Sequence, residues 1–265
     1  MAATPPPVPS GNNGYEDVIR VRTSMRTCIL FALPQERKAL RWKDTPTLTI
    51  AVSGTGAANA ARATDQILRA AHPNLLIICG FAGALRPGMH PGDLVIATHV
   101  IGTGPDGTLL PQPLEADPEA TRLACDLVSA RAGTHVGTLY SAPRVLLTAK
   151  EKARCASQTG ADAVDMETAA AAAIATRYGV SWISVRSVTD DATADLPLDF
   201  NAVTGADGNT SMKLLLMELL RKPSAIPGLL KLGKGASAAA AALEQFLKQL
   251  IPAIEMEPNA SAKGK

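Results

Sequence analysis

Short apolar runs rich in β-branched residues alternate along this chain with segments of helix-forming residues. We expect strands at residues 27–33, 47–52, 75–79, 94–101, 136–140 and 180–188, with a short extended piece at 145–147. One helix is expected to begin at residue 34, and a second follows the glycines at 53–56 and ends at residue 71. Further helices are expected at residues 119–130, 149–157 and 169–178. Loops are expected at residues 80–83 and 102–118. Strands that alternate with helices over about 160 residues predict one parallel or mixed sheet covered on both faces.

The domain organisation follows from shifts in composition. Residues 1–24 are rich in Pro, Gly, Asn and Ser, which predicts a disordered tail, and Met25 is a candidate functional start. Residues 25–210 form the expected α/β domain. A helical extension is expected at 211–252, with helices at 211–221 and 236–251 and a short apolar piece at 225–232 between them. Residues 253–265 form a polar tail.

The C-terminal extension is basic. Between residues 211 and 251 six Lys or Arg residues stand against two Glu residues. Two interpretations remain open: a helical cap packed on the domain with a solvated basic face, or an interfacial surface for a membrane or a lipidic substrate. The second would give a peripheral membrane contact through the C-terminal helices.

Overall composition narrows the class of protein. The chain has 265 residues, 46% of them hydrophobic, and a formal net charge of +2, which does not favour a nucleic-acid partner. Its start lacks the apolar core of a secretory signal, and no apolar run reaches the roughly 18 residues of a membrane span. The four cysteines form no CxxC pair, so free thiols in a reducing compartment are expected. We therefore expect a cytoplasmic protein without a metal site or cofactor.

Acidic residues gather at the ends of two neighbouring elements. Asp165 and Glu167 stand where the helix at 169–178 begins, and Asp190 and Asp191 follow the strand at 180–188. In an open parallel sheet, ligands bind outside the carboxyl ends of the strands. The two acidic groups are therefore expected to face one ligand from two sides.

Glycines in the strand-to-helix segment at 53–56 allow a ligand to approach backbone N–H groups. A dinucleotide site is not favoured, because the third glycine of the fingerprint is missing and no acidic residue ends the next strand. Glu36 lies in the first turn of its helix, where the helix dipole alone would account for an acidic residue.

Together these segments resemble the nucleoside phosphorylase/nucleosidase superfamily, in particular its methylthioadenosine/S-adenosylhomocysteine nucleosidase branch. The matching strings, in the family's order over about residues 26–200, are FALPQE (31–36), VSGTGAANA (52–60), ICGFAGAL (78–85), PGDLVIA (91–97), AVDMETAA (163–170) and VRSVTDDA (185–192). The C-terminal LLLMELLRKPSAIPGLLKLG resembles the tail of hopanoid-associated members, which are often labelled phosphorylases and are thought to remove adenine from adenosylhopane. The resemblance implies a single-domain, three-layer α/β/α fold with a mixed, largely parallel sheet, and a homodimer.

The resemblance also implies roles for particular residues. Asp190 matches the general acid that protonates adenine N7, for which it must hold a proton near neutral pH through burial or the neighbouring Asp191. Glu36 matches the residue that activates water, and Arg186 matches the arginine beside it. A buried strand arginine needs a carboxylate partner, and Glu36 is the candidate. Glu167 matches the residue that binds the ribose hydroxyls and stabilises the cationic sugar.

Other matching positions would contact the sugar and the base. Met166 would pack on the ribose, and Asp165 stands where the branch usually has Glu. Phe81 replaces a small hydroxyl residue, which indicates a more apolar ligand. The remaining positions that would line the sugar and base are Ser53, Gly54, Ala82, Gly83, Val145 and Leu146, of which Val145 and Leu146 would offer backbone groups to the adenine edge.

These roles predict a nucleosidase that hydrolyses the bond between ribose and adenine in a 5′-substituted adenosine. Phosphorolysis is the alternative, but the strand at 75–79 carries no basic residue for a phosphate and Glu36 would repel one. The 5′ substituent, a hopanoid or the small thioether of methylthioadenosine, stays open. A third possibility is a non-catalytic nucleoside-binding protein that has kept the fold.

Overall fold

The computed structural model describes residues 26–39, 42–203, 217–219 and 221–256. Its strands are β1 (Thr27–Phe31), β2 (Leu48–Val52), β3 (Leu75–Ala84), β4 (Leu94–Gly102), β5 (Leu114–Glu115), β6 (Thr134–Ser141), β7 (Ala163–Asp165) and β8 (Ser181–Asp190). Its helices are α1 (Pro34–Ala39), α2 (Ala57–Ala71), α3 (Pro118–Val128), α4 (Ala149–Thr159), α5 (Thr168–Arg177), α6 (Phe200–Val203) and α8 (Ile226–Met256), with a 3₁₀ turn η1 at Pro223–Ala225.

The eight described strands form one mixed sheet. β2, β1, β3 and β8 are parallel neighbours, as are β4, β6 and β7, while β8 runs antiparallel to β4 and β7 antiparallel to β3. The pairings β3–β8–β4–β6–β7–β3 therefore close a ring beside the open part of the sheet. This curled sheet brings the ends of β3, β7 and β8 close together.

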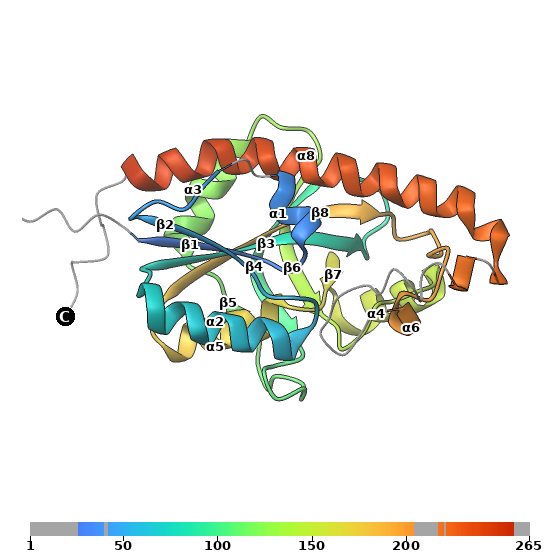
Figure 1. The fold of residues 1–265 in the computed structure, drawn as a ribbon, viewed down its shortest axis with the longest axis horizontal. Coiled ribbons are helices and arrows are strands. Elements are labelled where there is room, and N and C mark those ends of the chain that lie inside the picture. The colour runs from blue at the N-terminus through green and yellow to red at the C-terminus, as the bar shows by residue number, and fades with distance from the viewer. Residues whose placement is uncertain (1–25, 40–41, 204–216, 220, 257–265) are drawn as a thin grey trace, which may run out of the picture.

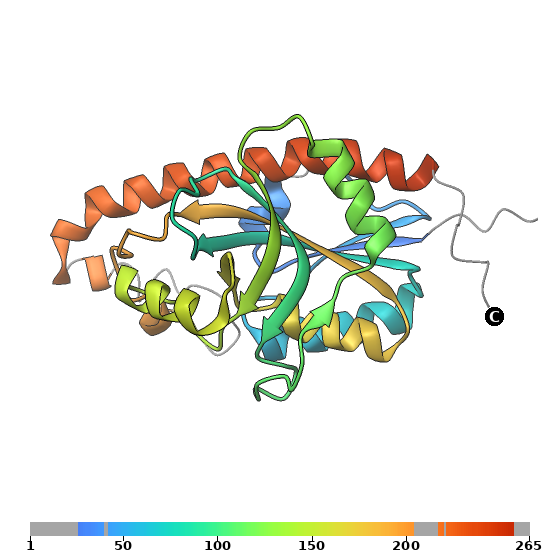
Figure 2. The ribbon, with the colours of Figure 1, turned by 180° about the vertical axis from the view of Figure 1, so that it is seen from behind.

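Helices cover the sheet on two sides, which confirms the predicted three-layer α/β/α class. α2 and α5 pack together on one side, and α8 crosses the other side with α1 and α3 (Figures 1 and 2). On the first side, Ala169–Ala172 of α5 are fully buried. Their small side chains let the α5 backbone lie close to the sheet, which sets the position of the residues just before this helix.

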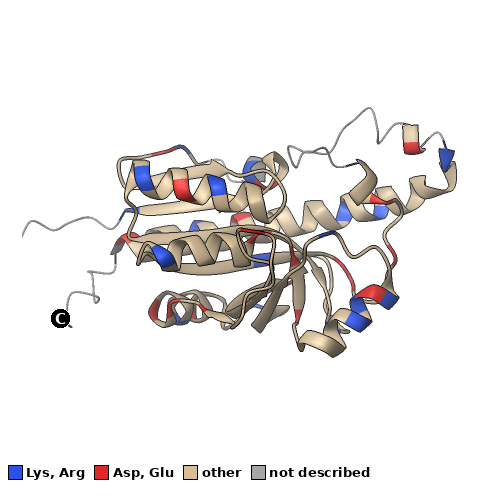
Figure 3. Cartoon of the chain, turned by 90° about the horizontal axis from the view of Figure 1, so that it is seen from below, with Lys and Arg blue, Asp and Glu red and all other residues tan. Residues whose placement is uncertain are grey.

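Basic and acidic side chains are interspersed over the helices. In the view of Figure 3, neither sign forms a large patch on the described chain. Within the described ranges, no helix, α8 included, is both long enough and apolar enough to cross a membrane.

Several predicted boundaries are wrong near the site. β3 continues through the segment 80–83 that we expected to be a loop, because β8 and β7 hydrogen-bond to this segment from its two sides. β8 likewise runs through Asp190 instead of ending before it. The extended piece expected at 145–147 is not a strand, and the two-residue β5 lies within the expected loop at 102–118.

The C-terminal segment also differs from expectation. Instead of a short piece and a separate helix, residues 226–256 form the single helix α8, which passes through Gly233, Gly235 and Pro252. Glycine normally weakens a helix by about 1 kcal/mol, but burial of an apolar face stabilises this one. The buried side chains on this face, which pack against the sheet and α3, are Ala242, Leu243, Phe246, Leu247, Leu250, Ile251 and Ile254. The helix expected at 211–221 falls mostly outside the described residues, as do the tail at 1–24 and most of the tail at 253–265.

Close packing against β8 explains why α8 has a glycine at position 235. A Cβ built on this buried glycine would collide with the backbone oxygen of Thr189, at the end of β8. Gly233, two residues earlier, is exposed, and a Cβ there meets nothing within 4 Å. The absence of a side chain at position 235 therefore lets α8 lie directly against the carboxyl end of β8.

We predict that Gly235→Ala destabilises the protein by about 1–3 kcal/mol, because the added methyl group overpacks the contact with β8. Gly233→Ala is the matched control and should stabilise the protein by about 0.5–1 kcal/mol, since alanine is the better helix former. Urea unfolding measures both. A similar gain in both variants would contradict the close contact between α8 and β8.

Candidate active site

A cavity of about 390 Å³ lies where the carboxyl ends of β1, β3, β7 and β8 meet. The predicted site residues in its wall are Glu36, Phe81, Ala82, Gly83, Val145, Leu146, Asp165, Met166, Glu167 and Asp190. The general-acid candidate and both glutamates therefore share one cavity, which a common reaction requires. Ser53, Gly54 and Arg186 are not among the residues that line it.

Arg186 lies behind the cavity as a fully buried cation, with 1% of its side chain exposed. Its guanidinium forms an ion pair with Asp165 at 2.5 Å and lies 3.8 Å from Glu167. Thr168 Oγ1 accepts two further hydrogen bonds from Arg186, at 2.7 and 3.2 Å. The expected direct pair with Glu36 is wrong: Asp165, the last residue of β7, is the ion-pair partner of Arg186. Burial alone would lower the pKa of Arg186, but the surrounding carboxylates, Asp165 most strongly, raise the pKa by more than burial lowers it. Arg186 is therefore a permanent cation.

Asp165 is held in place from several sides. Its carboxylate accepts a hydrogen bond from the Ser141 hydroxyl at 2.5 Å and from the Thr168 N–H at 3.1 Å, besides the Thr168 hydroxyl. The substitution of Asp for Glu at this position thus matches a structural role: the short side chain fixes Arg186 and the start of α5.

Glu167 is buried where α5 begins. Its Oε1 accepts a hydrogen bond from the Gly56 N–H at 2.8 Å. This bond links the glycine segment that precedes α2 with the start of α5. Burial raises the pKa of Glu167 to about 7, against the lowering effect of Arg186, and the nearby Asp165 carboxylate adds to the rise. Glu167 can therefore bind hydroxyl groups in either protonation state and becomes ionised near neutral pH.

Glu36 is also buried, with 2% exposure, and faces the cavity from α1. Its carboxylate accepts hydrogen bonds from the N–H groups of Ala32 (2.9 Å), Leu33 (2.8 Å) and Phe81 (2.8 Å). Burial raises its pKa, although Arg186 and these N–H groups oppose the rise. A carboxylate has about four acceptor positions, so one remains for a water molecule.

Asp190 has an unexpected partner. The buried Lys152 of α4 donates to its Oδ2 at 2.5 Å, and the Thr189 hydroxyl lies 2.7 Å from its Oδ1. The Asp191 carboxylate, expected to help Asp190 keep a proton, accepts instead from the Thr193 hydroxyl and N–H. The charge next to Asp190 is therefore a cation and not a second carboxylate.

The chain also matches a known protein family over most of its length. A model described as the phosphorylase superfamily matches residues 37–221. The chain belongs to the phosphorylase superfamily.

Among known members of this superfamily, the 5′-methylthioadenosine/S-adenosylhomocysteine nucleosidase of Exiguobacterium sp. is 26% identical over 182 residues, covering 64% of this chain and 78% of that protein. The nucleosidase of the same name from Shewanella baltica is 29% identical over 189 residues, covering 66% and 80%.

Solved structures of the superfamily share the fold. Futalosine hydrolase of Helicobacter pylori matches with a TM-score of 0.66 at 17% identity, over 87% of this chain and 98% of that one. The 5′-methylthioadenosine/S-adenosylhomocysteine nucleosidase from Neisseria meningitidis, in complex with methylthio-immucillin-A, matches with a TM-score of 0.65 at 20% identity, over 86% and 99%.

Two expected ligand contacts of this superfamily member are displaced. Thr55, not Ser53 or Gly54, lines the cavity from the glycine segment, and the Ser53 hydroxyl donates to backbone oxygens instead. The backbone N–H and C=O of Val145 are both hydrogen-bonded to the side chain of Asn201. Of the two residues expected at the adenine edge, Leu146 is the one whose backbone makes no hydrogen bond within the described part of the chain.

Sequence reasoning missed several residues of the cavity. Lys152 was assigned to a helix without a role, because a helical lysine is normally a solvated residue. The signal for it is the capping box of Thr148 and Glu151, which fixes where α4 begins and turns Lys152 inward with Cys155 one turn later. The other missed residues that line the cavity include Leu196 and Phe200, and Leu232 and Ala236 of α8.

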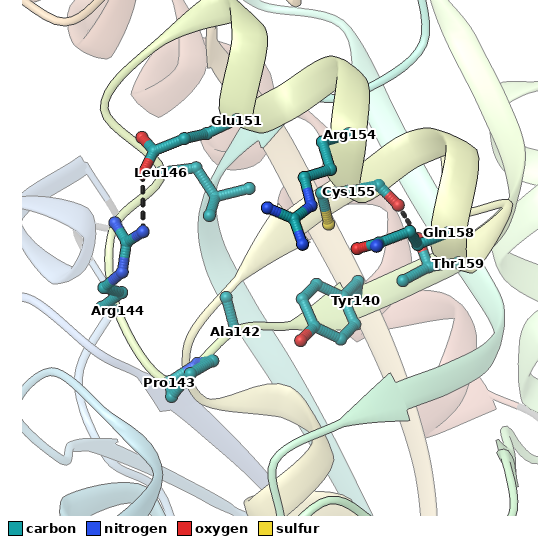
Figure 4. A pocket seen from close by; sticks show the side chains of 10 residues that line it. All are labelled: Tyr140, Ala142, Pro143, Arg144, Leu146, Glu151, Arg154, Cys155, Gln158 and Thr159. Atoms are coloured by element: carbon teal, nitrogen blue, oxygen red, sulfur yellow. Dashed lines mark hydrogen bonds and ion pairs between the residues drawn. The ribbon is translucent and has the colours of Figure 1, made fainter.

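A second cavity of about 290 Å³ lies beside the first, between α4 and the segment after β6. Figure 4 shows Arg144 reaching Glu151, while Arg154 and Gln158 extend from α4 toward Tyr140. The two cavities share Arg144 and Leu146, but none of the acidic residues assigned to catalysis lines the second one. Among the described residues, no cluster of His, Cys, Asp or Glu has the arrangement of a metal site.

The raised pKa of Glu167 predicts how stability depends on pH. Between pH 4.5 and about 7, the unfolded chain has lost the Glu167 proton while the folded chain still holds it. The folded state then binds more protons, so the free energy of unfolding falls as pH rises through this window. Glu167→Gln removes the titrating group and keeps an oxygen for the Gly56 N–H.

The wild-type protein should therefore lose more stability between pH 5 and pH 7 than Glu167→Gln does, as measured by urea unfolding at both pH values. Glu119→Gln is the matched control, because the Glu119 side chain is exposed on α3 and forms no ion pair among the described residues, so it should leave the wild-type pH dependence unchanged. Parallel pH dependence in the wild type and Glu167→Gln would contradict the assignment.

Proposed function

We propose that this enzyme hydrolyses the N-glycosidic bond between ribose and adenine in a 5′-substituted adenosine. The enzyme class, a nucleosidase, is the one its relatives carry; the substrate, the nucleophile and the residue roles are our proposal. The observation that supports it most is that Asp190, Glu167 and Glu36 line a single cavity. Glycosidic cleavage needs a proton donor for the leaving group and carboxylates that stabilise a cationic sugar and activate water.

In the proposed reaction, Asp190 donates a proton to N7 of adenine. The bond from C1′ to N9 then breaks, and its electron pair leaves with the base. Glu167 stabilises the ribosyl cation and binds the ribose hydroxyls, while Met166 packs on the sugar. Water bonds to C1′ and gives a proton to Glu36, whose raised pKa suits a general base. Glu36 ends protonated and Asp190 ionised, and proton exchange with solvent restores both.

Water is favoured over phosphate by the pairing of the cations. The cavity wall contains two basic residues in the described chain, Arg144 and Lys152. Arg144 pairs with Glu151 at 2.6 Å and Lys152 with Asp190, so neither presents a free cation to an anion. Arg186 is surrounded by carboxylates. A phosphate dianion would also approach the buried Glu36 at an unfavourable electrostatic cost.

The proposed function predicts adenine release that is independent of phosphate, with water as the second substrate. Asp190→Asn should lower this rate by about 10²- to 10⁴-fold, the usual contribution of general acid catalysis. Liquid chromatography of the products, with and without phosphate, measures both effects, and calorimetry with a nucleoside analogue checks that binding persists.

Each alternative has its own outcome. Strict dependence on phosphate, with a ribose 1-phosphate product, would replace hydrolysis by phosphorolysis. Binding of adenosine derivatives without release of adenine from any of them would indicate a nucleoside-binding protein.

For the 5′ substituent we propose an apolar group as large as a hopanoid. Phe81, Phe200 and Leu232 give the cavity an apolar wall, and α8 extends this wall away from the carboxylates. A cavity of about 390 Å³ lies in the lower range of ligand sites, so a polycyclic tail would extend beyond it. The half-buried Leu229 lies one turn before Leu232 on the same face of α8 and offers a continuation.

The same end of α8 suits a peripheral contact with a membrane. Lys222, Lys231 and Lys234 are exposed beside the apolar Ile226 and Leu230. Apolar side chains next to lysines are typical of surfaces that lie at a lipid interface. A contact there would place the cavity near a lipidic substrate.

The proposed tail path predicts a selective effect of Leu229→Gln. kcat/KM for an adenosine with a long hydrocarbon 5′ substituent should fall about 10-fold, equivalent to about 1.4 kcal/mol of lost apolar contact. The value for methylthioadenosine should stay within about twofold. Val136→Gln, at a side chain 51% exposed on β6, is the control and should change neither substrate. Equal losses on both substrates would exclude this path for the tail.

A further inference from the structure

Lys152 is a buried lysine that the proposed reaction does not yet use. Its side chain is 1% exposed, and its Nζ lies 2.5 Å from Asp190 Oδ2. It also donates to the backbone oxygens of Asp191 at 2.8 Å and Ala194 at 2.9 Å. An ammonium group has three protons and no acceptor, so these three oxygens satisfy the charged form completely. A buried charge is tolerated only with such partners, and the surroundings of Lys152 are therefore built for a cation.

The lysine makes the two oxygens of Asp190 unequal. Oδ2 accepts from the ammonium group and has no room for a proton of its own on that side. Oδ1 faces the Thr189 hydroxyl at 2.7 Å, and that hydroxyl also lies 3.3 Å from the backbone oxygen of Ala82. A hydroxyl has one proton: when Thr189 donates it to Ala82, its oxygen can accept a proton from Asp190 Oδ1. Both the ionised and the protonated form of Asp190 therefore fit the same site.

We propose that Lys152 is a positioning residue of the catalytic acid, which directs the transferable proton of Asp190 to Oδ1. This inference rests on the proposed function, because it assumes that Asp190 protonates the leaving base. The ion pair fixes the carboxyl group by Oδ2 and leaves Oδ1 as the oxygen that gives its proton to adenine. The charge of Lys152 also stabilises the carboxylate that remains after Asp190 has given its proton to the base.

Other charged groups surround this pair. Asp191 follows Asp190 in the chain, and its pKa is lowered first by the Thr193 hydroxyl and further by Lys231 of α8 and by Lys152. Glu167 faces the cavity from the start of α5, with a pKa raised by burial to about 7. Because Asp191 is bound to Thr193, Lys152 is the charged side chain in direct contact with Asp190 among the described residues.

The test is Lys152→Met, which keeps the length of the side chain and removes its charge. The pH-independent plateau of kcat should fall about 10- to 100-fold, part of the usual contribution of a general acid. At the same time, the alkaline limb of the kcat/KM profile should move to higher pH by about one unit, because no cation favours the ionised carboxylate. A lysine that only joins α4 to the segment after β8 would lower the plateau without moving this limb, and that result would overturn the proposal.

A second substrate separates a role in proton donation from general damage to the site. Hydrolysis of 4-nitrophenyl β-D-riboside has a leaving group that needs no protonation, so its rate should change less than about threefold in Lys152→Met. An equal loss with this substrate and with the adenosine derivative would contradict a role through Asp190.

Thr189 provides a second variant if Lys152→Met fails to fold. Thr189→Val removes the hydroxyl that donates to Oδ1 once its proton has moved to the base, and should lower kcat at least about 10-fold, whereas Thr189→Ser keeps the hydroxyl and should retain a rate well above that of Thr189→Val. Equal rates in the two variants would overturn the assignment of the proton to Oδ1. Failure of the proposed function is separate: it would appear as full activity in Asp190→Asn, whatever Lys152 does.

Discussion

The guanidinium of Arg186, buried at the centre of β8, is the charge around which the site is arranged. A buried cation must be compensated, and the chain surrounds it with Asp165, Glu167 and Glu36 from three different elements. Three carboxylates for one guanidinium are more negative charge than the cation can balance. Burial raises the pKa of both glutamates, and repulsion from Asp165 and Glu36 adds to the rise at Glu167, while the closest carboxylate, Asp165, forms the ion pair.

Close approach of these groups depends on small residues in β3. A Cβ at Gly80 would lie 2.7 Å from Glu36 Oε1 and would also collide with the Arg186 guanidinium, and a Cβ at Gly83 would lie 3.3 Å from Asp190 Oδ2. The glycines of β3 thus leave space that a side chain would otherwise fill. They leave room for charged side chains from α1 and β8 on the two ends of the cavity.

The two ends differ in chemistry. Around Arg186 there is an excess of carboxylate, which suits a developing sugar cation and a water-activating base. At the other end, the ammonium group of Lys152 faces Asp190, which suits a donor that must give up a proton. Glu36, among carboxylates, can therefore act as a base, while Asp190, beside an ammonium group, acts as an acid in the same cavity. α8 supplies an apolar wall between this cavity and solvent.

The sequence pattern by itself determined the α/β class, most element positions and the meeting of Glu167 with Asp190, whereas Glu36 entered the site through the family resemblance. These are local properties: apolar runs form strands, and side chains at strand ends meet at one edge of a sheet. Only the tertiary structure decided that residues 80–83 are strand, that Gly235 is a contact inside a continuous α8, that Asp165 holds Arg186, and that Lys152 reaches Asp190. Each of these depends on a partner between 21 and 107 positions away, such as Asp165 for Arg186 or Asp190 for Gly83. The pattern of one segment records its own exposure but not which charge lies opposite it.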